Sequence, residues 1–168
     1  TIYDLQSSLS AELAEDYFGS ATTFVAAEID QITRKAKILS VGDSRAYLID
    51  AQGKWQQITQ DHSILSELLA DFPDKKEEDF ATIYGGVSSC LVADYSEFQD
   101  KIFYQEIEIQ QGESLLLCSD GLTDGLSADV REKVWKQYDN DKSRLTVYRK
   151  LIEKQRFYDD LSVIICAF

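Results

Sequence analysis

The chain has 168 residues, of which 44% are hydrophobic and 28% charged, so it can bury a core and is not a disordered segment. Thirty acidic residues oppose 17 basic ones, and the formal charge of -13 would repel nucleic acid, because the basic residues form no cluster. The apolar runs are only as long as strands, so we expect a soluble, cytoplasmic protein that binds neither nucleic acid nor membrane.

The first third of the chain predicts one helix followed by strands. Leucines recur at positions 5, 9 and 13, which is the spacing of an amphipathic helix over residues 2–17. β-branched and apolar runs predict strands at residues 22–29, 36–41, 45–49 and 55–59. We interpret these strands as an antiparallel meander, with the sequence Gly-Asp-Ser-Arg at a bend between two of them.

The rest of the chain alternates between helical and strand patterns. A helix is expected over residues 61–69 with Asp61 as its N-cap, and the run 71–79, which holds the one proline, predicts an exposed loop. Further on, the patterns predict strands at 103–109, 115–118 and 163–168, and helices at 128–138 and 143–154. Taken alone, these elements predict a single α+β layered domain over residues 1–168.

The three cysteines are not expected to form disulfides, bind zinc or act in catalysis. Their number is odd, they lie in or beside apolar runs, and they show no Cys-x-x-Cys spacing, which argues against a disulfide framework or a zinc site and for a reducing compartment. We expect Cys90, Cys118 and Cys166 to be buried small hydrophobes. A catalytic thiol is not expected, because the one imidazole, His62, would have to be its partner.

Three aspartates stand at the ends of strand-like apolar runs: Asp43, Asp120 and Asp159. One Asp beside Gly or Ser is commonly a turn residue that hydrogen-bonds its own backbone. Three of them at separate strand ends instead suggest a cage for hard cations, because carboxylate oxygens are the ligands that Mg²⁺ and Mn²⁺ prefer.

Four motifs follow one another along the chain: Gly-Asp-Ser-Arg at 42–45, Gln-Ile-Thr-Gln-Asp-His-Ser at 57–63, Ser-Asp-Gly-Leu-Thr-Asp at 119–124 and Asp-Asp-Leu-Ser at 159–162. In this order the set resembles the metal-dependent protein serine/threonine phosphatases of type 2C, from about residue 20 to residue 168. The resemblance implies an α+β fold in which two antiparallel β-sheets are sandwiched between helical layers. It also implies a binuclear Mn²⁺ or Mg²⁺ site in a cleft at one edge of the sheets.

The resemblance further implies that a metal-activated water attacks the phosphorus directly, so that no residue is catalytic beyond the metal ligands. Asp120 and Asp159 match two ligands of one metal, and Asp43 matches the ligand of a third, weaker ion, which gives two or three ions in all. Asp160 is expected to orient its turn, and Arg45 to hydrogen-bond backbone or a carboxylate. His62, in the Asp-His-Ser motif, is expected to be structural.

One departure from the family concerns its first half. The family carries there an Asp-Gly-x-Gly-Gly motif whose Asp bridges both metals, an upstream acidic ligand and an arginine that grips phosphate, and nothing before Thr22 matches these. The chain begins at Thr1 and contains no methionine. We therefore expect the amino-terminal strands to lie outside these 168 residues. The alternative is a protein that has lost them.

Three functional hypotheses follow. The first is metal-dependent hydrolysis of phosphoserine and phosphothreonine in a phosphoprotein substrate. The second is a catalytically inactive relative that binds a phosphoprotein or a regulatory partner, which the missing bridging Asp favours. The third, a two-metal nuclease, is opposed by the acidic balance of the chain. The sequence pattern indicates no oligomeric state. It also does not decide whether residues 71–100 form a substrate-recognition flap.

Overall fold

The computed structural model covers residues 1–168, and the structure describes all of them except residues 14, 81–85, 95–97, 99–100 and 157. Its elements run in the order α1 (Ile2–Leu13), β1 (Ala21–Thr22), β2 (Phe24–Asp30), β3 (Lys35–Val41), β4 (Arg45–Ile49), β5 (Trp55–Gln57), α2 (Ile64–Asp71), η1 (Glu77–Phe80), β6 (Leu91–Val92), β7 (Phe103–Glu108), β8 (Ser114–Cys118), α3 (Asp120–Thr123), α4 (Ala128–Gln137), α5 (Asp141–Ile152) and β9 (Val163–Ala167). Among the described helices, none has the length and apolar character that crossing a membrane requires.

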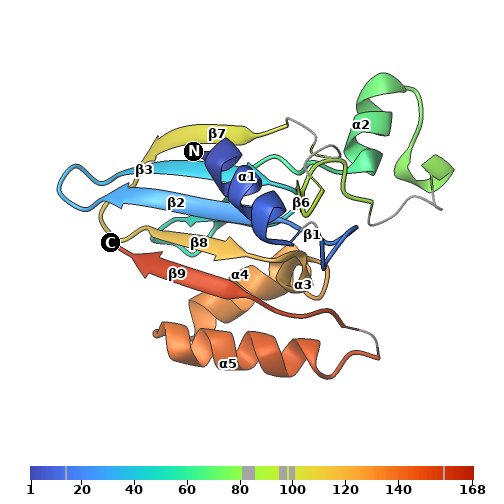
Figure 1. Cartoon of the computed structure of the whole chain (residues 1–168). Coiled ribbons are helices and arrows are strands. Elements are labelled where there is room, and N and C mark those ends of the chain that lie inside the picture. Colours follow the sequence, from blue (N-terminus) through green and yellow to red (C-terminus); the bar gives the residue numbers. More distant parts are fainter. Residues whose placement is uncertain (14, 81–85, 95–97, 99–100, 157) are drawn as a thin grey trace.

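The strands form antiparallel ladders throughout. One sheet has the order β2-β3-β7, the other has the order β5-β4-β8-β9, and β1 pairs with β6 in a short ladder of its own. Figure 1 shows the first sheet above the second, with α1 over the first and α4 and α5 beside the second. The predicted fold class, two antiparallel sheets between helical layers, is confirmed.

Among the described residues, three apolar clusters separate these layers. One lies between α1 and the three-stranded sheet and contains Ile2 and Val41. The second lies between the two sheets and contains Ile38 and Leu115. The third, which contains Tyr148, lies between the four-stranded sheet and the helices α4 and α5. The molecule is therefore built from four layers.

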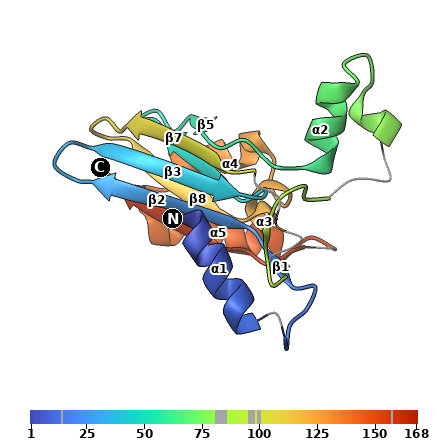
Figure 2. The same cartoon turned by 45° about the horizontal axis from the view of Figure 1, so that its top comes forward.

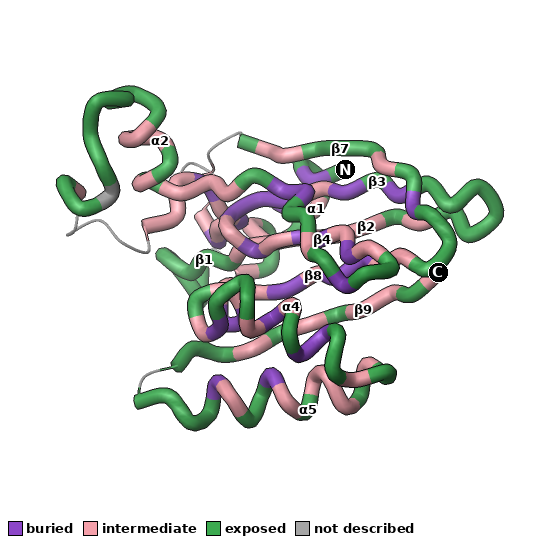
Figure 3. The backbone as a smooth tube through the Cα atoms, turned by 180° about the vertical axis from the view of Figure 1, so that it is seen from behind, coloured by how far each residue is buried: buried purple, intermediate pink, exposed green. Residues whose placement is uncertain are grey.

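Strand β8 illustrates why the sequence folds in this way. Its side chains alternate between two clusters, so that Leu115 and Leu117 face the other sheet while Leu116 and Cys118 face α4 and α5. A strand that is covered on both faces needs apolar side chains at every position, and this explains the continuous apolar run. Figure 3 shows the buried residues gathered along the central strands.

Several predicted boundaries and connections differ from the structure. The meander is wrong, because β3 pairs with β2 and β7 whereas β4 pairs with β5 and β8. The Gly-Asp-Ser-Arg bend therefore carries the chain from one sheet to the other. Figure 2 shows the two sheets from a second direction. The first helix ends at Leu13, four residues before the predicted end. The run 71–79 is not all loop, since α2 reaches Asp71 and a 3₁₀ turn begins at residue 77.

Candidate functional site

The register of the four-stranded sheet brings three of the motifs to one edge of the sheet, namely the edge formed by the ends of its strands. Arg45, the first residue of β4, is paired with Cys118, the last residue of β8. Cys118 is in turn paired with Val163, the first residue of β9. Because the strands are antiparallel, the residues just before β4, just after β8 and just before β9 all lie beyond the same edge. Asp43, Asp120 and Asp159 stand in these three positions.

The turns that carry Asp120 and Asp159 are packed directly against each other. Ser119 donates its backbone N–H to the carbonyl of Ser162 at 3.0 Å and its hydroxyl to the carbonyl of Asp160 at 3.2 Å. Gly121 has no side chain because the backbone of Asp160 and Asp159 occupies the space that a Cβ would need. The Asp159 carboxylate accepts the N–H of Asp160 at 2.7 Å, which orders the turn before β9.

The carboxylates at this edge influence one another's ionisation. Partial burial, followed by the charge of Asp120, raises the pKa of the Asp43 carboxyl. Desolvation and the same Asp120 charge raise the pKa of the Asp124 carboxyl, and the charge of Asp159 adds to this effect. Such mutual repulsion shows that several like charges share one region.

Asp124 is the residue that sequence reasoning missed. It follows Asp120 by one helical turn and closes α3, donating its N–H to the carbonyl of Asp120 at 2.8 Å. The sequence contained a signal for it: Asp124 ends the Ser-Asp-Gly-Leu-Thr-Asp motif, four residues after Asp120. Residues four apart in a helix lie on the same face, so the two carboxylates could have been expected together.

The donor set suits a hard divalent cation, because the described groups are carboxylates whose charges raise one another's pKa values. Within the described ranges, however, no group of three His, Cys, Asp or Glu side chains is close enough to hold a metal ion. The sequence-predicted ligands Asp43, Asp120 and Asp159 thus share one edge, and their common coordination of a cation stays a prediction.

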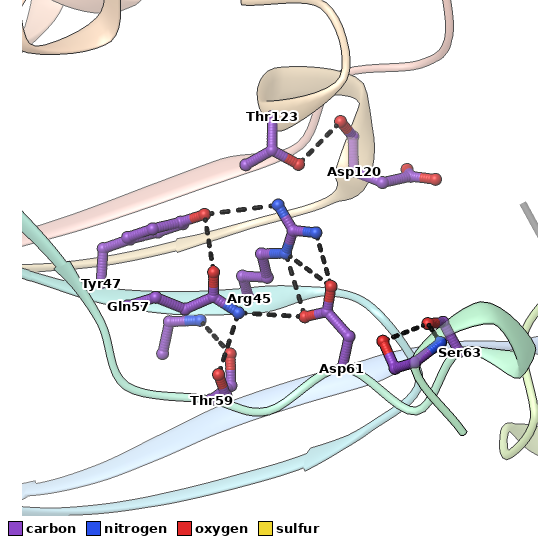
Figure 4. A network of polar contacts seen from close by, with 10 residues as sticks. Arg45, Tyr47, Gln57, Thr59, Asp61, Ser63, Asp120 and Thr123 are labelled. Atoms are coloured by element: carbon purple, nitrogen blue, oxygen red, sulfur yellow. Dashed lines mark hydrogen bonds and ion pairs between the residues drawn. The ribbon is translucent and has the colours of Figure 1, made fainter. Parts of the chain in front are cut away.

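Arg45 and Asp61 form an ion pair beneath this edge (Figure 4). The Arg45 guanidinium donates from Nε to both carboxylate oxygens, at 3.0 and 2.9 Å, and from Nη2 to Oδ2 at 2.5 Å. Gln57 also donates its side-chain amide to Asp61, at 3.1 Å. Arg45 thus binds a carboxylate, as the sequence predicts, whereas Asp61 does not cap a helix. The N-cap of α2 is Ser63, whose hydroxyl accepts the N–H of Ser66 at 3.1 Å.

The cysteines agree with the sequence analysis only in part. Cys118 is buried, and burial raises the pKa of its thiol to about 12, so it stays protonated and inert at neutral pH. Cys90 and Cys166 are only partly buried, which corrects the prediction that all three are buried. Burial and the charge of Asp43 raise the pKa of the Cys90 thiol.

A groove of about 570 Å³ lies beside α2, and one of its lining residues, His62, hydrogen-bonds Gly42 in the Asp43 bend. Its lining includes His62, Glu67, Lys101 and Phe103. Lys101 donates to Glu67 at 2.6 Å and so connects the segment before β7 to the helix. Residues 81–85, 95–97 and 99–100 fall outside the described part of the chain, so the expectation of a flap over 71–100 remains an expectation.

Comparison with known proteins identifies relatives of this chain. The model of the family described as protein phosphatase 2C matches residues 5–150. A serine/threonine phosphatase stp from Listeria innocua is 35% identical over 128 residues, which are 76% of this chain and 49% of that protein. The chain thus spans about half the length of the curated relatives it matches.

Solved structures share the fold. The serine/threonine phosphatase Stp1 from Staphylococcus aureus superimposes with a TM-score of 0.77 at 27% identity, over 98% of this chain and 64% of that one. The catalytic domain of the serine/threonine protein phosphatase PstP, solved with two manganese ions, gives a TM-score of 0.73 at 22% identity, over 95% of this chain and 65% of that one.

Proposed function

The chain belongs to the protein phosphatase 2C family, and from this premise we propose that the full-length protein hydrolyses phosphoserine and phosphothreonine in phosphoproteins with the help of divalent cations. The single observation that carries the proposal is the gathering of Asp43, Asp120 and Asp159 beyond one edge of the four-stranded sheet. A cytoplasmic location is part of the proposal, because the substrates are phosphorylated proteins of the cell.

We assign the cation ligands from the positions of the motifs. Asp120 and Asp159 would hold one cation, because their turns pack together through Ser119. Asp43 would hold a further cation, because its charge environment includes Asp120. The choice of Mn²⁺ or Mg²⁺, and of two or three ions, is proposed from the donor chemistry and from the manganese complex of PstP.

When bound, divalent cations lower the pKa of water and neutralise charge on phosphoryl oxygens. The protein's own part is to fix the carboxylates. Arg45 and Asp61 form a neutral pair that anchors the start of β4, next to Asp43. An excess of carboxylates also makes the cations necessary, because a phosphate dianion is repelled from this edge until their charge is balanced.

The proposal is tested by measuring hydrolysis of p-nitrophenyl phosphate and of a phosphothreonine peptide by the full-length protein. We expect turnover in Mn²⁺ and its loss on addition of EDTA, with recovery when Mn²⁺ is added back in excess. Turnover that chelation leaves unchanged would exclude the mechanism. Binding of the phosphopeptide without any turnover would support the inactive alternative instead.

A further inference from the structure

The backbone of Gly42 is held at both of its polar groups by one residue that lies twenty positions further along the chain. Gly42 donates its N–H to Nδ1 of His62 at 3.0 Å. His62 donates its own backbone N–H to the carbonyl oxygen of Gly42 at 2.9 Å. The residue after Gly42 is Asp43, so these two bonds fix the backbone from which that carboxylate projects.

The bend has little freedom to rearrange. Gly42 has φ of +107°, a value that disfavours residues with a side chain, and a Cβ there would lie 2.5 Å from Cγ2 of Thr23. On the other side of Asp43, the Ser44 hydroxyl is 2.8 Å from the Thr23 hydroxyl. Asp43 therefore stands between Gly42, which His62 holds, and Ser44, which contacts Thr23.

The other side of His62 is joined to the beginning of α2. Its carbonyl oxygen accepts the N–H of Ser88 at 2.8 Å, and the next residue, Ser63, is the N-cap of the helix. Ser88 also donates its hydroxyl to Glu67 in α2. One residue thus contacts the Asp43 bend with its ring and its N–H, and the α2 region with its carbonyl.

The ring can accept the Gly42 N–H only in its neutral form with the proton on Nε2, since imidazolium has no acceptor nitrogen. The surroundings favour this form. Burial, followed by the charge of Lys101, lowers the pKa of His62, against the opposite influence of Glu67 and Asp61. At neutral pH the ring is therefore able to keep the contact.

We propose that His62 is a positioning residue that fixes the backbone at Asp43 and couples it to α2 and to the groove that His62 and Glu67 line. The coupling is reciprocal, because a ligand that favours one arrangement of the bend must favour the matching arrangement of α2 to the same degree. The effect of a cation bound at Asp43 rests on the proposed function. The hydrogen bond between Gly42 and the His62 ring does not depend on it.

The first test needs no substitution. His62 is the one histidine of the chain, so ¹⁵N NMR of the wild-type protein at pH 7 assigns its ring without ambiguity. We expect a neutral ring with the proton on Nε2 and with Nδ1 accepting a hydrogen bond. A charged ring, or a proton on Nδ1, would overturn the proposal.

The second test compares three variants by amide hydrogen exchange at the 42–44 bend and in α2. His62→Ala removes the acceptor, so we expect exchange at the bend to rise about tenfold, near the contribution of one hydrogen bond. His62→Asn keeps an acceptor close to the Nδ1 position and should restore slow exchange. Ser63→Ala removes the α2 cap but leaves the ring, so it should speed exchange in α2 alone. Failure of His62→Asn to rescue, or equal effects of Ser63→Ala at the bend, would contradict the assignment.

The third test concerns the coupling. In the full-length wild type, Mn²⁺ at a concentration that saturates its calorimetric binding should slow amide exchange in α2, and in His62→Ala it should not. Saturated binding in the wild type that leaves α2 exchange unchanged would overturn the coupling. An absence of any binding heat would instead overturn the proposed cation site, and the ring tautomer and the exchange at the bend would still decide the role of His62.

Discussion

At the scale of single residues, Asp124 gives the clearest sign of electrostatic strain. The residue as a whole is exposed, but partial burial of its carboxyl, followed by the charges of Asp120 and Asp159, raises its pKa. A carboxyl that resists ionisation in the folded state favours folding only while it is protonated. Asp124 and Asp43 therefore contribute stability below the ordinary pKa of 3.8, and this contribution is lost as the pH rises through their raised folded values.

Asp124→Asn should therefore raise the melting temperature of the cation-free protein at pH 7, because it removes one of several charges that repel one another. The gain should shrink as the pH is lowered through the raised pKa of the Asp124 carboxyl, because the wild-type side chain then takes up its proton. Differential scanning calorimetry in EDTA across this pH range measures the effect. Asp139→Asn, an exposed change between α4 and α5, is the control and should give a small shift that does not follow the same pH dependence.

Asp120→Asn keeps the size and shape of the side chain but removes the charge that would hold a divalent cation. We expect Mn²⁺-dependent turnover in the full-length protein to fall at least about a hundredfold, since even residues that only support metal ligands cost 10–100-fold. Circular dichroism should stay unchanged. Mn²⁺ should also raise the melting temperature of the wild type more than that of the variant, because a ligand specific for the folded state stabilises it by mass action.

Asp160→Asn is the matched control for this change, because Asp160 is the neighbour of a proposed ligand and is expected to orient the turn alone. It should retain turnover within a few-fold of the wild type. Equal Mn²⁺ shifts in wild type and Asp120→Asn, measured at the same metal concentration, would show that Asp120 is a turn residue.

At the scale of elements, the helices that cover the four-stranded sheet begin in different ways. Asn140, the N-cap of α5, accepts the N–H of Ser143 at 2.9 Å, whereas Ser127 at the start of α4 makes no side-chain cap bond. Asn140→Ala should lower the free energy of unfolding by about 1 kcal/mol. Ser127→Ala should lower it by clearly less. Urea unfolding measures both, and equal losses would contradict this account of the caps.

The strands were predictable because burial on one or both faces leaves a regular apolar pattern, as in residues 115–118 of β8. The connection between β3 and β4 was not, because a local pattern does not say which sheet a strand joins. Asp61 was misread as a cap since its real partner, Arg45, lies sixteen residues away and is met only in the folded chain. The shared edge of the three aspartates, by contrast, follows from strand ends that the sequence does reveal.

At the scale of the whole molecule, β9 is an outermost strand of the four-stranded sheet. Among the described residues, no further strand pairs with its free side. Ile164 in this strand is 61% exposed. An open apolar edge is a template for pairing with another chain. We therefore expect the 168-residue chain to self-associate at high concentration through β9.

Ile164→Lys should reduce this association, because a lysine on an edge strand opposes pairing with a second copy. Sedimentation velocity over a series of concentrations provides the measurement. Ile32→Lys is the control, since Ile32 is 95% exposed but lies in the turn between β2 and β3. If both substitutions lower association equally, general charge repulsion rather than the strand edge is responsible.

The aromatic cluster beneath α4 and α5 has an optical consequence. Both tryptophans of the chain lie there, with the ring centroids of Trp55 and Trp135 5.8 Å apart and the guanidinium of Arg144 4.0 Å above the second ring. Intrinsic tryptophan emission therefore reports on the layer between the four-stranded sheet and its helices, and it is blind to α1. Far-ultraviolet circular dichroism reads the backbone of every layer. The difference between the two signals during unfolding would reveal whether α1 separates from its sheet before the remainder of the molecule melts.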